Sequence, residues 1–158
     1  MQYFDPFAPA FWITVGMAML CGGIIGIERQ LRGKPAGVRT SILICLSTTI
    51  FIHLGSFATG ELADPTRVLG QIVTGIGFLG AGVIISREGA VTGVTTAAVV
   101  WTLAAIGATI GFGHYKGAFA LSLVTVVVLW VMDILEERAT AIFGRGAHKP
   151  AKDVAKPQ

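Results

Sequence analysis

Apolar residues fall in five long runs, and the segments between the runs contain nearly all of the charged residues. A helix of about 20 apolar residues crosses ~30 Å of hydrocarbon, since each residue rises ~1.5 Å. Charges stay in the gaps because a charge at the bilayer centre costs roughly 2.5 to 3.5 kcal/mol or more. The pattern predicts an all-α membrane protein, a bundle of about five transmembrane helices. We expect these helices at residues 10–27, 40–58, 68–85, 92–112 and 117–135.

The composition supports this prediction. Of 158 residues, 53% are hydrophobic and 13% are charged, whereas a soluble domain is about 25% charged. We expect one transmembrane domain, residues 1–136, and a disordered basic cytoplasmic tail, residues 137–158, because the Gly, Pro and Lys mixture of the tail cannot bury enough surface to fold. Contact of the tail with anionic lipid and simple solvation both stay open. The first nine residues contain no Lys or Arg, so we expect the N-terminus to be retained rather than cleaved as a signal peptide.

The distribution of Lys and Arg predicts the orientation. With five helices, ten of these residues fall on one side and only Arg67 and Lys116 on the other. Basic residues in short loops are held in the cytoplasm, which predicts an outer N-terminus and a cytoplasmic C-terminus. The same residues do not line one helix face with interleaved aromatics, so we expect the lipid bilayer as partner and no nucleic acid.

Glycines are frequent in the third and fourth runs. The stretch GIGFLGAG contains the G-x-G-x-x-G pattern of dinucleotide sites, but that pattern is informative only in a soluble strand–turn–helix unit. We read the glycines instead as packing residues, because small side chains let membrane helices approach closely. The third and fourth helices are expected to pack on each other or on a symmetry mate, and a glycine-lined path with exposed carbonyls is the alternative. The interface candidates are Gly22, Gly26, Gly75, Gly77, Gly80, Gly82, Gly93, Ala97 and Gly107.

The densest group of charges lies between the first two helices. Glu28 and Arg29 end the first helix, and Arg39 and Thr40 begin the second. A short loop holds these ends together, so we expect Glu28 to pair with Arg39 at the cytoplasmic face. Two roles stay open for Glu28: an anchor of the helical hairpin, or a gate or cation-attracting carboxylate.

A second polar group surrounds the entry to the third helix. Asp64, Arg67 and Gln71 lie there, and we expect Asp64 before Pro65 to cap the helix. Gln71 either lines an ion path or makes an interhelical hydrogen bond.

Further polar candidates lie in the last two helices. Thr95 and Thr96, like Gln71, either line an ion path or make interhelical hydrogen bonds. Asp133 joins Glu28 in an acidic group on the cytoplasmic side. Carboxylate oxygens suit Mg²⁺, so Mg²⁺ is a candidate ligand or substrate, although no metal site is assigned.

Enzymatic chemistry is not expected. The sequence contains no phosphate-binding loop, no paired carboxylates in mid-membrane and no metal-ligand motif. We therefore predict a protein that is not an enzyme and has no covalently bound cofactor. Cys21 and Cys45 are expected to be reduced thiols.

Three segments closely resemble the MgtC/SapB family of bacterial inner-membrane proteins: GIIGIERQLRGKPAGVRT, DPTRVLGQIVTGIGFLGAGVII and VTGVTTAAVVWTLAAIG. The resemblance covers roughly residues 16–135 and implies a multi-pass plasma-membrane protein tied to magnesium homeostasis. It departs from some members, which have Asn and Cys where this sequence has Thr95 and Thr102, and from longer members with a soluble C-terminal domain. Residues matching the family motifs are Gly26, Glu28, Arg29, Gly37, Arg39, Thr40, Asp64, Arg67, Gln71, Gly75, Gly77, Phe78, Gly80, Ala81, Gly82, Gly93, Thr96, Ala97, Ala98 and Trp101.

Two functional hypotheses follow. The first is a small magnesium or cation transporter, or channel-like module, that acts as a homo-oligomer of two or more copies, because five short helices can hardly enclose a pathway alone. The second is a regulatory protein that transports nothing and binds another membrane complex, such as a cation transporter or the ATP synthase. The label of magnesium transport ATPase, sometimes given to the family, is not supported by the sequence.

Overall fold

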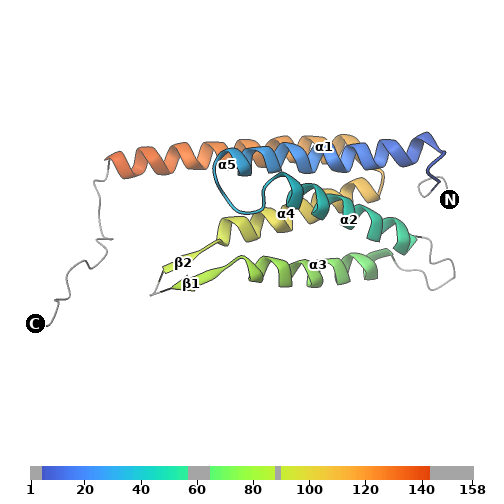
Figure 1. Cartoon of the computed structure of the whole chain (residues 1–158), viewed down its shortest axis with the longest axis horizontal. Coiled ribbons are helices and arrows are strands. Elements are labelled where there is room, and N and C mark those ends of the chain that lie inside the picture. The colour runs from blue at the N-terminus through green and yellow to red at the C-terminus, as the bar shows by residue number, and fades with distance from the viewer. Residues whose placement is uncertain (1–4, 57–64, 88–89, 143–158) are drawn as a thin grey trace, which may run out of the picture. The chain divides into compact units, whose positions relative to one another are not determined.

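The computed structural model describes residues 5–56, 65–87 and 90–142. Five helices and one hairpin follow one another along the chain (Figure 1). The chain divides into two compact units, Met1–Val126 and Val127–Gln158, and the packing described below lies within the first. The elements are α1 (Pro9–Leu31), α2 (Val38–Ser56), α3 (Pro65–Gly82), β1 (Ile85–Arg87), β2 (Ala90–Thr92), α4 (Val94–Gly111) and α5 (Tyr115–Ile142).

The predicted all-α membrane architecture is confirmed. Of the five described helices, α1, α2, α4 and the part of α5 from Tyr115 to Leu135 are long and apolar enough to cross a membrane. Helix α3 has 18 residues but includes Arg67, Gln71 and five glycines, and its composition falls short of the other four. The crossing by α3 and the orientation of the termini stay predictions.

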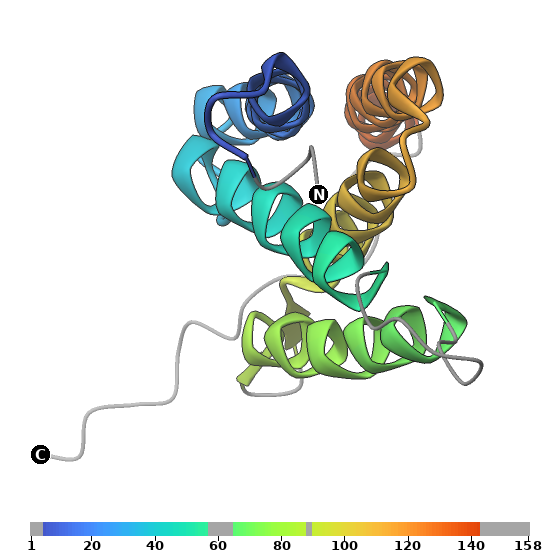
Figure 2. The same cartoon turned by 90° about the vertical axis from the view of Figure 1, so that its right-hand side faces the viewer.

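Helices α2 and α4 form the middle of the first unit, with α1 on one side and α3 on the other (Figure 2). Small residues permit this packing. A Cβ atom on Gly107 of α4 would lie 2.5 Å from the Cys45 carbonyl oxygen of α2, and one on Gly111 would lie 2.6 Å from the Ile52 Cβ. The core around these contacts includes Ile25, Ile52 and Leu103, all buried.

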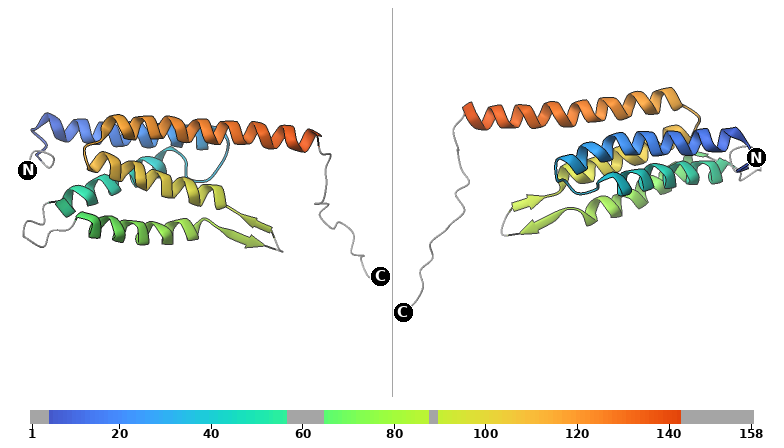
Figure 3. Two further views of the ribbon diagram at one scale, coloured as in Figure 1. Left: turned by 180° about the vertical axis from the view of Figure 1, so that it is seen from behind. Right: turned by 45° about the horizontal axis from the view of Figure 1, so that its top comes forward.

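The hairpin between α3 and α4 was not predicted. Strands β1 and β2 are antiparallel, with Ile85 opposite Thr92 and Ser86 opposite Val91, and they continue from the ends of α3 and α4 (Figure 3). Each strand has three residues, which is too short for the alternation that identifies strands in a sequence. The predicted end of the third helix at residue 85 is therefore wrong, since α3 ends at Gly82.

Helix α5 is longer than predicted. It continues to Ile142, so it includes the first residues that were assigned to the tail, and the domain boundary at residue 137 stays a prediction. The apolar run stops near Leu135, but Glu and Ala are good helix formers and carry the helix onward. Residues 143–158 of the predicted tail lie outside the described residues.

Candidate functional site

The turn between α1 and α2 is built from local hydrogen bonds. The Lys34 amide donates to the Arg29 carbonyl oxygen at 2.9 Å, and the Ser41 hydroxyl donates to the Ala36 carbonyl oxygen at 3.0 Å. Gly33 and Ala36 both have left-handed backbones, with φ of 62° and 60°. A left-handed alanine costs roughly 1 to 2 kcal/mol, so the bond from fully buried Ser41 supports a conformation that the sequence alone disfavours.

Two glycines bring the end of α1 onto the start of α2. A Cβ atom on Gly22 would lie 2.7 Å from the Ser41 carbonyl oxygen, and one on Gly26 would lie 2.6 Å from the Val38 Cα. The Gln30 side-chain oxygen also accepts a bond of 3.4 Å from the Val38 amide. The last turn of α1 is thereby fixed in position.

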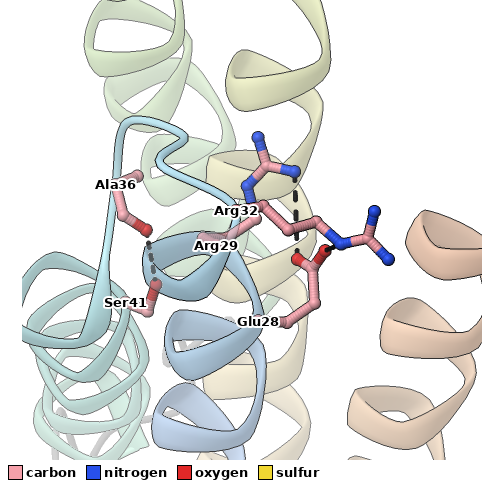
Figure 4. Close-up of polar contacts among 5 residues, drawn as sticks. All are labelled: Glu28, Arg29, Arg32, Ala36 and Ser41. Atoms are coloured by element: carbon pink, nitrogen blue, oxygen red, sulfur yellow. Dashed lines mark hydrogen bonds and ion pairs between the residues drawn. The ribbon is translucent and has the colours of Figure 1, made fainter. Parts of the chain in front are cut away.

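Glu28, Arg29 and Arg32 form a charged cluster on this fixed turn (Figure 4). The Arg32 Nε lies 2.7 Å from Glu28 Oε1, and an Arg29 Nη1 lies 3.9 Å from Glu28 Oε2. The side chains of Arg29, Glu28 and Arg32 are 3%, 9% and 26% exposed, respectively. We call these three residues the Glu28 cluster.

The Glu28 cluster is charge-paired but incompletely hydrogen-bonded. Among the described residues, neither Glu28 oxygen nor the Arg29 Nε has a hydrogen-bond partner, because the short Arg32 contact is an ion pair without hydrogen-bond alignment. Within these three residues, one carboxylate faces two guanidinium groups.

The expected pair between Glu28 and Arg39 is wrong. Arg39 is exposed near the start of α2, and Glu28 pairs with Arg32. Arg32 lies four residues after Glu28 on the same helix, which places the two side chains on one face. Sequence reasoning missed Arg32, although this spacing was the signal that could have identified it.

The structure describes two of the three polar residues predicted at the entry to α3. Asp64 lies outside the described residues, so its predicted capping role stays a prediction. Arg67 and Gln71 are exposed. Gln71 lines an apolar groove of about 690 Å³ between α2 and α3, and Thr40 lines the same groove.

The remaining polar candidates come from α4 and α5. Thr96 of α4 is buried, whereas Thr95 is exposed. Asp133 belongs to the second unit and is half-buried. Within the described part of the chain, no group of three or more His, Cys, Asp or Glu side chains is arranged to hold a metal ion. Cys21 and Cys45 are buried free thiols, as expected.

The candidate interface glycines divide into two kinds. Those of α1 and α4 contact α2, and Gly80 of α3 approaches Ala97 of α4, where an added Cβ would lie 3.8 Å from the Ala97 Cβ. Gly93, at φ 91°, begins α4 against the Val83 carbonyl. In contrast, a Cβ atom on Gly75, Gly77 or Gly82 of α3 would meet nothing within 4 Å.

Two interhelical hydrogen bonds made by threonines were also missed. The Thr49 hydroxyl of α2 donates to the Gly107 carbonyl oxygen of α4 at 2.9 Å, and the hydroxyls of Thr14 in α1 and Tyr115 in α5 lie 2.7 Å apart. Threonines are spread over all the predicted helices, so the sequence contained no signal to single these out.

Comparison with known proteins identifies relatives over most of the chain. The profile of the MgtC family matches residues 15–138. The chain is 40% identical over 135 residues to "Putative magnesium transporter YhiD" of Escherichia coli K12, covering 81% of this chain and 63% of that protein. It is 44% identical over 125 residues to "Protein MgtC" of Salmonella typhimurium LT2, covering 79% and 52%. It is 39% identical over 137 residues to "Protein MgtC" of Brucella abortus, covering 84% and 56%.

The chain therefore spans between about half and two thirds of the length of these curated relatives. No solved structure matches it.

Proposed function

The chain belongs to the MgtC family and is a multi-pass bacterial membrane protein, and from this premise we propose that it serves magnesium homeostasis as a small cation-transport module. The proposal includes Mg²⁺ as the transported ion and assembly as a homo-oligomer in the inner membrane. The name of the Escherichia coli relative supports the choice of ion.

The observation that carries the proposal is the Glu28 cluster. Ionisable side chains buried at a membrane helix are costly, and they commonly mark ion pathways. The Glu28 side chain is only 9% exposed, and its oxygens have no hydrogen-bond partner in the described part of the chain. In this proposal, Arg32 and Arg29 hold the carboxylate closed, and their displacement frees it for a hydrated cation.

The test is Mg²⁺ uptake into liposomes that contain the purified protein. The parent is expected to carry Mg²⁺ faster than empty liposomes, and Glu28→Gln is expected to lose most of this flux. Lys116→Gln is the matched control, because it also removes one charge but lies exposed at the start of α5. No flux by inserted, folded parent protein would contradict transport, and equal flux in both variants would remove Glu28 from the pathway.

A second candidate function is regulation of another membrane complex without transport. The charge balance of the Glu28 cluster favours it, because two arginines already compensate the single carboxylate. It predicts that the protein supports growth at low magnesium while the same purified protein shows no flux. Flux that accompanies growth across a variant series would exclude this candidate.

A further inference from the structure

Helix α3 is little covered by its neighbours in the first unit. Of its residues from Thr66 to Gly82, only Ile76 and Gly80 are buried within the chain. It nevertheless runs along α2, since their shared groove is lined from Thr40 to Gly55 on one helix and from Val68 to Leu79 on the other. Because α2 is long and apolar enough to span the membrane, the predicted crossing by α3 places it at the same depth.

The composition of α3 does not suit lipid on its exposed side. Its Gln71 side chain is exposed and makes no hydrogen bond to the described residues. Gln71 comes six residues after the start of α3, which places it about 9 Å along the helix axis. At that depth lipid tails offer no hydrogen-bond donor or acceptor, and an unsatisfied amide is costly.

One face of α3 contains Gln71 and Gly75, which also line the groove with α2. The glycines of this face have no packing role among the described residues. Gln71, Gly75, Phe78 and Gly82 recur at spacings of four, three and four, so they share one side of the helix. We call this set the Gln71 face. Phe78 is 82% exposed, and a Cβ atom on Gly75 or Gly82 would meet nothing within 4 Å. Each glycine costs a helix up to about 1 kcal/mol relative to alanine, and no contact within the described chain explains that cost.

We propose that the Gln71 face binds the same face of a second copy of this chain, with the two Gln71 amides hydrogen-bonded to each other. A primary amide has both donors and an acceptor, so it is complementary to itself. Copies in one membrane share their orientation, and a two-fold axis along the membrane normal brings Gln71 of each copy to the same depth. Gly75 and Gly82 then let the two α3 backbones approach closely. The pairing rests on the homo-oligomer of the proposed function and does not require transport.

The first test is the mass of the full-length protein in mild detergent, measured by light scattering. The parent is expected to be a dimer or larger, and Gln71→Leu is expected to weaken self-association roughly tenfold. Gln71→Asn keeps the amide and is expected to keep most of the association. Gln71 is exposed within the chain, so Gln71→Leu leaves the core unchanged. A monomeric product is therefore ascribed to the lost contact between copies and not to misfolding.

The second test maps the contact by cysteine cross-linking in membranes. Gly75→Cys is expected to form a covalent dimer on oxidation. Leu121→Cys is the control, because Leu121 is 46% exposed and belongs to a different helix, α5. The two native cysteines are fully buried, so the parent gives the background.

The outcomes separate this inference from transport. A monomeric parent, with the Gln71 face covered by lipid, would overturn it. An oligomer whose mass is unchanged in Gln71→Leu, or equal cross-linking at positions 75 and 121, would overturn the assignment to this face. Neither readout depends on Mg²⁺ flux, so loss of flux with an intact Gln71-dependent dimer would contradict the proposed transport alone.

Discussion

Gly26 of α1 and Val38 of α2 are in direct contact, so that a Cβ atom on Gly26 would lie 2.6 Å from the Val38 Cα and 3.0 Å from the Ser41 Cβ. The nearest atom belongs to the backbone, which cannot rotate away as a flexible side chain does. This contact holds the last turn of α1, and with it Glu28, against the start of α2.

The contact predicts that Gly26→Ala destabilises the protein although alanine favours helices. Separation of α1 from α2 is expected to cost roughly 1 to 3 kcal/mol. Gly16→Ala is the control within the same helix, since its Cβ would meet nothing within 4 Å, and it is expected to be neutral or to gain up to about 1 kcal/mol. Thermal unfolding in detergent measures both, and equal effects would contradict the contact.

The junction between the hairpin and α4 gives a second prediction. Gly93 and Gly113 have φ values of 91° and 82°, so alanine at either position is strained by roughly 1 to 2 kcal/mol. Only at Gly93 would a Cβ also collide with the Val83 carbonyl. Gly93→Ala is therefore expected to lower the melting temperature more than Gly113→Ala does. Equal losses would show that the backbone strain, and not the collision with the Val83 carbonyl, determines the melting temperature.

The helices could be predicted from the sequence because lipid imposes a simple rule on length and polarity. The rule gives no information about contacts that depend on three-dimensional packing. Gly107 was expected to face α3 or a symmetry mate, yet it packs against α2. A face of small residues on a helix shows that something approaches it closely, but the identity of the neighbour is set by the fold.

The candidate site could be predicted only in part, for a related reason. Glu28 and Arg29 were identified as charges at a helix end, and the structure places both in one buried cluster. The partner of Glu28 was assigned across the loop to Arg39, since the sequence does not show that Ala36 takes a left-handed backbone or how the turn directs α2. The short hairpin was missed because three-residue strands have almost no pattern.

The interhelical bond of Thr49 gives a third prediction. Its hydroxyl oxygen lies 2.8 Å from the Cys45 carbonyl oxygen of its own helix and 2.9 Å from the Gly107 carbonyl oxygen of α4. Thr49→Val keeps the shape and is expected to cost about 0.6 to 1.7 kcal/mol, the range for such bonds in membranes.

Thr102→Val is the control for this substitution. The Thr102 hydroxyl donates at 2.9 Å to Ala98 on its own helix, so its loss is expected to change stability little. Unfolding of both variants by denaturing detergent measures the difference. A cost for Thr102→Val as large as that for Thr49→Val would contradict an interhelical role of the Thr49 hydroxyl.

The Glu28 cluster gives the last prediction, a coupling between Glu28 and Arg29. Glu28→Gln leaves the Arg29 guanidinium buried without its carboxylate, and breaking one side of a buried pair costs roughly 3 to 5 kcal/mol. Arg29→Gln is expected to be similarly costly, because it leaves Glu28 with only Arg32. The double variant removes both charges and is expected to be more stable than the sum of the two single losses predicts.

Arg32→Gln is expected to cost less, since Arg32 is 26% exposed and water can partly replace its contact with Glu28. Denaturation of the four variants and the parent measures the coupling as a double-mutant cycle. Strictly additive losses would show that the 3.9 Å contact between Glu28 and Arg29 is proximity without interaction, and the Glu28 cluster would then reduce to the Glu28–Arg32 pair.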